Sequence, residues 1–206
     1  MATTFFAPRG WDCFFSGICV QKDVSTNQDL SVSPKSTRLK GKRLAMAVCG
    51  GIGAVEVVKI IRELRRHGAE VFPFMTPSAG GFITPLSVSW AAGREVASES
   101  GYEANHLTPF DLVIVAPATL NTIAKAALAL ADNSVGLLLA SHIGGRKPVL
   151  FVPAMNAGMK RHPEFENYRQ KLESWGGHFL VPEEEEDRLK MPTPETLAAW
   201  ACENLK

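Results

Sequence analysis

The stretch that most constrains the fold of this chain is residues 112–133, LVIVAPATLNTIAKAALALADN. It opens with apolar, mostly β-branched residues, which are typical of a strand buried on both faces of a parallel sheet. The pattern breaks at Ala116-Pro117 and continues as an alanine-rich helical segment. Small and polar residues at such a break can hold a ligand at the carboxyl end of a strand. The same residues also fit a capped strand-to-helix turn with Thr119 as the N-cap, and both interpretations stay open at this point.

The rest of the chain alternates strand and helix patterns around this stretch. Further strand patterns lie at 43–48, 69–75, 147–152 and 178–181. Helical patterns lie at 54–67, 86–92, 165–175 and 193–205. This alternation predicts an α/β fold, doubly wound around a mostly parallel sheet. The loops at 49–53, 76–82, 116–122 and 153–156 would then converge on one side of the sheet.

A glycine-rich turn, CGGIG at 49–53, follows the first strand of the domain and precedes a helix. Glycines let the backbone approach a ligand, and the free N–H groups at a helix start favour an anion. Glu56 stands where a dinucleotide fingerprint needs another glycine, and no Gly-Lys-Ser/Thr follows, so the turn suits a mononucleotide phosphate better than NAD or ATP. A tight turn that serves packing alone is the alternative.

Charge, hydropathy and cysteine usage exclude several classes of partner. The net charge is +1, so no strong field points to nucleic acid or to an anionic membrane surface. No apolar run is long enough to cross a bilayer. The four cysteines, Cys13, Cys19, Cys49 and Cys202, lack metal-ligand spacing and fit free thiols in the cytoplasm. A disulfide or half of a metal site at Cys13 and Cys19 is the alternative interpretation.

Residues 1–39 differ in composition from the rest and are expected to be an N-terminal extension and linker. They hold an aromatic and cysteine patch, followed by a Ser/Thr/Asn/Pro-rich stretch. They lack the pattern of a secretory signal. The aromatic patch could dock on the domain or on a neighbouring subunit. We expect one folded domain at 40–206, which is long enough for a substantial core.

The converging loops carry glycine, hydroxyl and amide groups but no metal cluster, no Ser-His-Asp order and no suggestive acid pair. A polar site without a strong nucleophile of its own indicates that a bound cofactor supplies the chemistry.

Four motifs resemble one known family. They are CGGIG (49–53), MTPSAGGFITPLSVSWAAGREV (75–96), APATLNTIAKAALALADN (116–133) and PAMNAGMKRHP (153–163). The chain from about residue 43 to 205 resembles the homo-oligomeric flavin-containing cysteine decarboxylases. The resemblance implies a Rossmann-like, three-layer flavoprotein domain that binds FMN and assembles as a homotrimer or as a larger assembly of trimers.

The resemblance also implies site residues. The positions that match the cofactor loops are Gly51, Ile52, Gly53, Ser78, Phe82, Ala118, Thr119, Asn121 and Thr122. In the implied reaction a cysteinyl thiol carboxylate, either a small molecule or a peptide, is oxidised and then loses carbon dioxide. His106 would be the base, because an imidazole titrates near neutral pH. Asn156 would orient the substrate carboxylate beside Met155, and His162 is expected to be structural. A surface-loop histidine is the alternative for His106.

Three departures from the family pattern keep the reaction open. The loop after His106 is about three residues shorter than is typical of these decarboxylases. Lys160 replaces the tryptophan that usually follows the PAMN motif. The region after the last strand, EEEEDRLKMP, lacks the cysteine that protonates the intermediate in phosphopantothenoylcysteine decarboxylases. The alternatives are therefore a flavin oxidoreductase similar to the dihydromethanopterin reductases, with a pterin or carrier partner, and a non-catalytic flavin-binding regulator.

Overall fold

The computed structural model describes residues 30–97, 107–181 and 188–205 in full. Of the remaining residues it describes the backbone of Trp11–Cys13, Cys19–Gln21 and Glu184–Glu185. The chain divides into two compact units, Met1–Ser31 and Val32–Lys206. In the first unit β1 (Trp11–Cys13) pairs antiparallel with β2 (Cys19–Gln21). The elements described below belong to the second unit.

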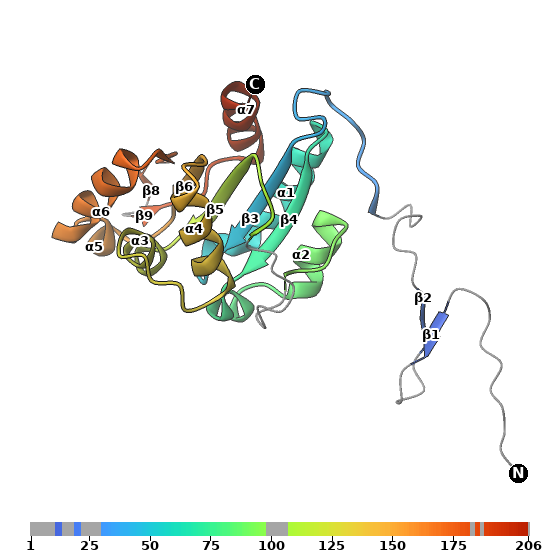
Figure 1. Ribbon diagram of the computed structural model, residues 1–206, viewed down its shortest axis with the longest axis horizontal. Helices are drawn as coiled ribbons and strands as arrows, with labels where there is room; N and C mark the ends of the chain where they lie inside the picture. Colours follow the sequence, from blue (N-terminus) through green and yellow to red (C-terminus); the bar gives the residue numbers. More distant parts are fainter. Residues whose placement is uncertain are drawn as a thin grey trace, which may run out of the picture. The chain divides into compact units, whose positions relative to one another are not determined.

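A five-stranded parallel sheet forms the centre of the second unit, in the order β4-β3-β5-β6-β7 (Figure 1). The strands are β3 (Arg43–Val48), β4 (Glu70–Met75), β5 (Leu112–Ala118), β6 (Val149–Pro153) and β7 (Gly177–Phe179). All residues of β5 and β6 are buried, which explains their continuous apolar runs. The chain winds outward from β3 to β4 and then from β5 to β7. This confirms the doubly wound topology and places its switch point between β3 and β5.

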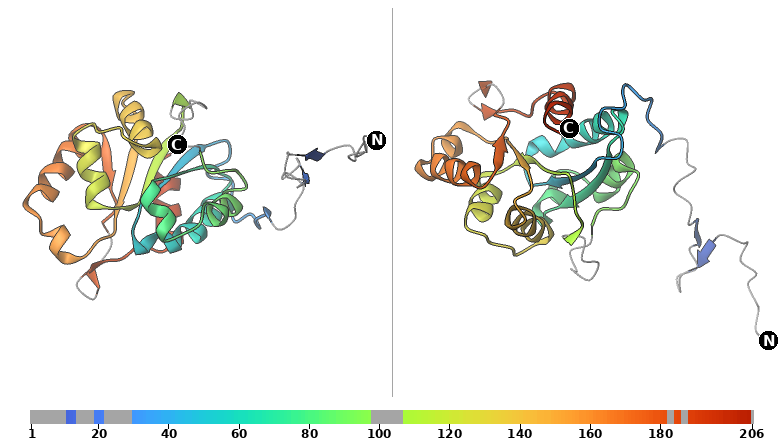
Figure 2. Two further views of the ribbon diagram at one scale, coloured as in Figure 1. Left: turned by 90° about the horizontal axis from the view of Figure 1, so that it is seen from below. Right: turned by 45° about the horizontal axis from the view of Figure 1, so that its top comes forward.

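Helices cover both faces of the sheet (Figure 2). One hydrophobic core contains side chains of α1 (Val57–Arg66), α2 (Pro85–Ala92) and α7 (Pro194–Asn204). The other contains side chains of α3 (Leu120–Ala127), α4 (Ser134–Gly144) and α6 (Pro163–Ser174). The fold is therefore the predicted three-layer sandwich. Within the described part of the chain, no helix combines the length and the apolar character needed to cross a membrane.

Short elements connect the larger ones near the carboxyl ends of the strands. Two 3-10 helices follow β3 and β4, namely η3 (Ile52–Glu56) and η4 (Pro77–Gly81). The short helix α5 (Ala157–Lys160) follows β6. Strands β8 (Glu184–Glu185) and β9 (Arg188–Leu189) form an antiparallel pair. The acidic run at 183–187 therefore contains a short strand, Glu184–Glu185, which pairs with β9.

Residues 112–133 divide differently from the prediction. Strand β5 continues through Pro117 to Ala118, with an irregular register against β6 after Val115. Thr119 caps α3 as expected, and its Oγ1 accepts a hydrogen bond from Thr122 N at 3.3 Å. The helix ends at Ala127, and the separate helix α4 starts after Asn133, whose Oδ1 accepts from Gly136 N at 2.9 Å. The predicted alanine-rich helix is thus shorter than expected, and α4, which begins after Asn133, was not predicted from the sequence.

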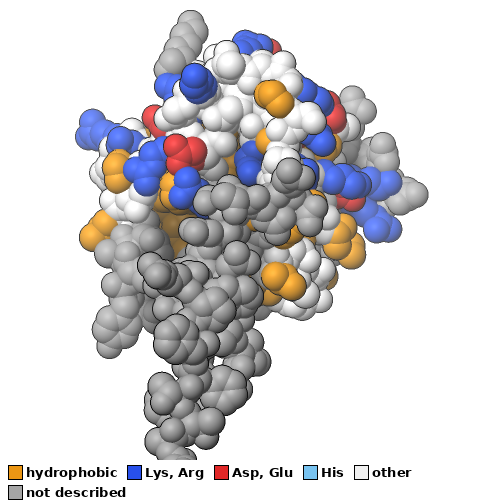
Figure 3. Space-filling model, turned by 90° about the vertical axis from the view of Figure 1, so that its right-hand side faces the viewer, with side chains coloured by type: hydrophobic (Ala, Val, Ile, Leu, Met, Phe, Trp, Pro, Cys, Tyr) orange, Lys and Arg blue, Asp and Glu red, His pale blue; other side chains and the backbone are white. Residues whose placement is uncertain are grey.

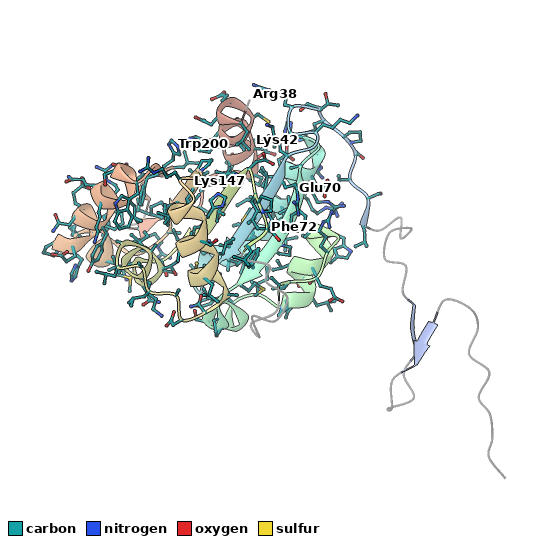
Figure 4. All side chains as sticks on the ribbon, in the orientation of Figure 1. Arg38, Lys42, Glu70, Phe72, Lys147 and Trp200 are labelled. Carbon is teal, nitrogen blue, oxygen red and sulfur yellow. The ribbon has the colours of Figure 1, made fainter. Side chains whose placement is uncertain are left out.

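Charged side chains lie at the start of the edge strand β4, where Figure 4 labels Glu70 and Phe72. The Arg94 guanidinium donates to Glu70 at 2.6 Å and lies 4.3 Å from the centre of the Phe72 ring. Arg43 approaches the same ring at 4.9 Å. Charged groups along an edge strand hinder pairing with another chain, so this edge is protected rather than open.

Residues 32–39 belong to the second compact unit, although the sequence predicts that the folded domain starts near residue 40. Lys35 N donates to Arg66 O at 2.7 Å, and the Leu39 side chain is fully buried. The Lys35 ammonium lies 2.6 Å from the buried Glu63 carboxylate, which also accepts from Arg66 at 2.9 Å. Burial alone would raise the pKa of Glu63, but these two hydrogen bonds hold it below its ordinary value. The segment is thereby held on the C-terminal end of α1.

Acid is expected to destabilise the domain through His142 in α4. Burial lowers the pKa of its imidazole from 6.5 to about 4, which the hydrogen bond to the Pro148 carbonyl opposes and the nearby Lys147 charge favours. Because the unfolded chain takes up this proton first as the pH falls, the stabilisation is complete above 6.5 and is lost toward about 4. The expected loss is ~3 kcal/mol of unfolding free energy.

Urea unfolding across this pH range measures the effect, with His142→Gln as the matched control. The glutamine amide retains a donor for the Pro148 carbonyl but does not titrate. The variant should therefore lose less stability than the wild type as the pH falls. Equal losses in both proteins would contradict the assignment to His142.

Candidate functional site

A cavity of about 1210 Å³ lies at the carboxyl ends of the strands. All four predicted loops contribute to its lining, through Gly50 to Gly53 after β3, Ser78 after β4, Thr119 to Asn121 after β5, and Ala154 to Asn156 after β6. The parallel strands place these loops at one edge of the sheet, beside the switch point. The convergence predicted from the sequence is therefore present in the structure.

Most of the predicted site residues line this cavity. They are Gly51, Ile52, Gly53, Ser78, Thr119, Asn121, Met155 and Asn156. Thr122 lines an adjoining cavity of about 240 Å³ that shares Ser78 and Asn121 with the larger one.

Two of the predicted residues, Ala118 and Phe82, line neither of these two cavities. Ala118 is fully buried in β5, and Phe82 is 44% exposed. His106 lies outside the described residues, so its role stays a prediction.

The glycines after β3 serve two different purposes. A Cβ on Gly50 would lie 2.4 Å from Ser78 Oγ, and a Cβ on Gly53 would lie 2.7 Å from Met191 Cγ. These two positions therefore permit close packing of neighbouring protein segments. A Cβ on Gly51 would meet only Thr119 and Pro117 side chains, at 3.6 Å or more. Packing explains Gly50 and Gly53, whereas Gly51 leaves backbone accessible to a ligand.

Hydroxyl groups gather where the loops after β4 and β5 meet. Thr119 Oγ1 lies 3.1 Å from Thr122 Oγ1, and Thr76 Oγ1 lies 3.2 Å from Ser78 Oγ. The first turn of α3 adds backbone N–H groups, which with the hydroxyls can bind a phosphate. These hydroxyl and backbone N–H groups are neutral donors, so they can bind an anion without a positively charged side chain.

The Cys49 thiol lies beneath this group of hydroxyls and is fully buried. Burial raises its pKa to about 11, although hydrogen bonds from the Thr122 side chain and the Thr119 backbone act in the opposite direction. The thiol therefore stays protonated near neutral pH, and a protonated buried thiol is a poor nucleophile. Cys49 supports the loop and does not supply reactive sulfur.

The loop after β6 fixes the orientation of the Asn156 amide. Its Oδ1 accepts from Met159 N at 2.9 Å and thereby caps α5. Because the oxygen serves the cap, the NH₂ group remains to donate hydrogen bonds into the cavity. Gly158 contributes to this arrangement, since a Cβ there would lie 3.3 Å from Asn156 Oδ1.

One wall of the cavity contains none of the predicted site residues. Arg188, Leu189, Lys190 and Met191 line it, and Leu189 N donates to Met155 O at 2.8 Å. A bridge also pairs Arg188 with Asn156. A strand of two residues produces no readable periodicity, and these contacts join distant parts of the chain. The only sequence signal for this region was the family resemblance, which compares EEEEDRLKMP with a segment that reaches the reacting carbon.

Three further lining residues come from the segment that follows Asn156. They are Met159, His162 and Tyr168. His162 stood within the PAMNAGMKRHP motif, but its position on the cavity depends on how α5 and α6 pack. Within the described residues, no group of three or more His, Cys, Asp or Glu side chains is arranged to hold a metal ion.

The fold and the site define a doubly wound α/β protein with a ligand cavity at the topological switch point. Its lining of glycine, hydroxyl and amide groups suits a phosphate-bearing ligand. The chain belongs to the Flavoprotein family, whose family model matches residues 32–206.

One known protein is similar in sequence over most of this chain. The chain is 36% identical over 175 residues to the coenzyme A biosynthesis bifunctional protein CoaBC of Thermococcus kodakarensis, covering 82% of this chain. It spans only 43% of that relative's length.

Two solved structures share the fold. MrsD from Bacillus sp. HIL-Y85/54728 has a TM-score of 0.72 at 23% identity, covering 82% of this chain and 99% of MrsD. The FMN-dependent cysteine decarboxylase SpaF has a TM-score of 0.68 at 24% identity, covering 78% of this chain and 95% of SpaF.

Proposed function

We propose that this protein is an FMN-dependent oxidative decarboxylase of a cysteine-like thiol carboxylate. The observation that carries the proposal is the capped Asn156 amide, which presents donors to a cavity that hydroxyl-bearing loops also line. The two substrate types that fit are phosphopantothenoylcysteine and a peptide with a C-terminal cysteine. The similarity to CoaBC and to SpaF supports the proposal.

The cavity has the size and the chemistry to hold FMN. Ligand pockets commonly measure about 300–1,000 Å³, so a cavity of about 1210 Å³ has room for a cofactor together with a substrate. The residues that would hold FMN are Gly51, Ile52, Gly53, Ser78, Thr119, Asn121 and Thr122. When bound, FMN would supply the capacity to accept a hydride from carbon.

The protein's own groups would position the substrate. The Asn156 NH₂ would donate to the substrate carboxylate and hold it until carbon dioxide leaves. Leu189 and Met191 would exclude water from one side, because both line the cavity and Leu189 is bonded to the Met155 backbone. His106 is proposed as the base on the resemblance alone.

The proposed product stays oxidised, as an enethiol. Completing the reduction requires an acid near the substrate carbon, and the resemblance assigns that role to a flap cysteine. In the described part of the chain, Cys49 and Cys202 are buried in the two cores, and neither lines the cavity. The segment from Arg188 to Met191, which lines the cavity, contains no thiol.

Mass spectrometry of the FMN-loaded protein with each substrate tests the proposal. The expected product has lost one carbon dioxide and two hydrogen atoms. A product that has lost carbon dioxide alone would overturn the enethiol assignment. Absence of any mass loss, together with bleaching of the flavin by NAD(P)H, would overturn the decarboxylase and support the reductase alternative.

We also propose a homotrimer and a cytoplasmic location. Apolar side chains near the cavity mouth and on α2 are exposed, with Ile52 at 69% and Leu86 at 78%. Figure 3 shows hydrophobic side chains among Lys and Arg on one face of the molecule. Subunit association would remove such residues from water. Light scattering of the wild type and of Leu86→Glu measures the assembly. We expect a trimer for the wild type and a smaller species for the variant, and a monomeric wild type would contradict the homotrimer.

The cytoplasmic location is proposed because the free cysteines Cys49 and Cys202 fit a reducing compartment.

A further inference from the structure

Two side chains at the ends of one short segment cap successive helices and also line the cavity. Asn156 caps α5, and His162 caps α6. Both belong to the lining of the 1210 Å³ cavity. In each residue the cap occupies the acceptor atom, so the donor atom is the one left for another partner.

The cap defines which nitrogen of His162 carries the proton. Glu164 N donates to His162 Nδ1 at 3.2 Å, so Nδ1 provides a lone pair. A neutral imidazole with an accepting Nδ1 carries its hydrogen on Nε2. His162 therefore has a fixed donor, as Asn156 does.

The carboxylates near His162 are engaged elsewhere. Glu166 accepts from Arg169 at 2.6 and 2.9 Å, and Glu164 Oε1 accepts from Asn167 at 3.3 Å. These contacts lie along α6 itself. The acidic groups of the first turn of α6 thus make their contacts within the helix. Glu56, a carboxylate that lines the same cavity, accepts from Lys59 at 3.0 Å. Each of these carboxylates has a partner of its own, and the His162 Nε2–H can donate to an anionic ligand.

We propose that His162 Nε2–H is a second donor to the substrate carboxylate, beside Asn156. This inference rests on the proposed decarboxylase function and deepens it. It makes His162 a substrate-binding residue that selects thiols with an adjacent carboxylate over thiols without one. Two donors from one capped segment would also fix the plane of the carboxylate, which a single donor leaves free to rotate.

The test compares two inert ligands on the FMN-loaded protein. One is the N-acylserine that carries the acyl group of whichever substrate is decarboxylated, phosphopantothenoyl or peptidyl. The other is the matching N-acylethanolamine, which lacks the carboxylate. The ratio of their dissociation constants, measured by calorimetry, isolates recognition of the carboxylate.

His162→Asp is the informative variant, because aspartate is a strong N-cap and preserves α6. Its carboxylate would repel that of the ligand, so the preference for the acylserine should fall about 10- to 100-fold. Binding of the acylethanolamine and the melting temperature should not change. His162→Asn, which keeps both a cap acceptor and a donor, should restore part of the preference. If the Asp protein does not fold, His162→Ser replaces it, because serine is also a strong N-cap but is too short to bring a donor to the position of Nε2.

Two outcomes separate the two proposals. An unchanged ratio in His162→Asp, with a wild type that decarboxylates its substrate, shows that His162 only caps α6 and overturns this inference alone. A wild type that neither prefers the acylserine nor decarboxylates any of these thiols overturns both.

Discussion

Gly50→Ala is expected to lose flavin binding and part of its stability. The added Cβ would lie 2.4 Å from Ser78 Oγ, 2.6 Å from Ser78 Cβ and 2.8 Å from the Ser78 backbone carbon. A change of side-chain rotamer relieves only the first of these contacts. The loop after β4 must therefore move away from the loop after β3, and both line the cavity. Overpacking of this kind costs about 1–3 kcal/mol, and FMN affinity should fall about 10-fold or more.

Gly80→Ala is the matched control for this experiment. Gly80 lies in η4, close to Ser78 in the chain, and a Cβ there would meet no atom within 4 Å. Thermal unfolding and flavin fluorescence titration of both variants provide the comparison. We expect the control to match the wild type in both measurements. Equal FMN affinity in Gly50→Ala and Gly80→Ala would show that the contact between the two loops does not shape the site.

Local patterns were sufficient to predict the sheet and the four loops that converge on the cavity, whereas the individual site residues came from the family resemblance. The continuous apolar run of β5 reports burial on both faces, and a strand buried on both faces implies helices above and below it. Thr119 and Thr193 mark the starts of α3 and α7 because their hydroxyls satisfy backbone N–H groups, at 3.3 Å and 3.2 Å. Once parallel strands are inferred, the position of the site follows from topology.

The features that were missed depend on contacts between distant segments. Residues 32–39 have the composition of a linker, yet Lys35 holds them on α1 through Glu63. Strand β9 is too short to show a period, and its place at the cavity depends on the Met155 backbone. His162 was expected to be structural because it matches the HP that ends the family motif, whereas its position on the cavity wall depends on how α5 and α6 pack. Sequence periodicity indicates which face of a helix or strand is buried, but it does not identify the segments that pack against that face.

The CGGIG motif also shows that a sequence pattern does not identify its tertiary partners. The sequence predicts that the turn brings backbone close to something, but it does not say to what. The structure assigns Ser78 to Gly50 and Met191 to Gly53, and it leaves Gly51 facing the cavity. A glycine-rich turn can therefore serve packing and ligand binding together, and the two explanations considered for CGGIG are not exclusive.

Asn156→Asp is expected to abolish most decarboxylation while leaving the fold intact. The aspartate oxygen can still accept from Met159 N, so α5 keeps its cap. The NH₂ donors are replaced by a negative charge that faces the substrate carboxylate. Loss of the donors and the added repulsion should lower kcat/KM by about 10²- to 10³-fold, which corresponds to about 3–4 kcal/mol of transition-state stabilisation.

Three measurements distinguish this role from a structural one. The melting temperature of Asn156→Asp should match that of the wild type, and FMN should bind with unchanged affinity, because the groups proposed to hold FMN lie on other loops. Asn156→Ala removes the cap as well, so it should lose both activity and stability. If Asn156→Asp retained wild-type turnover, the amide would serve only to cap α5. The substrate carboxylate would then need another donor from this wall of the cavity, and the His162 ring would be the nearest alternative along the chain.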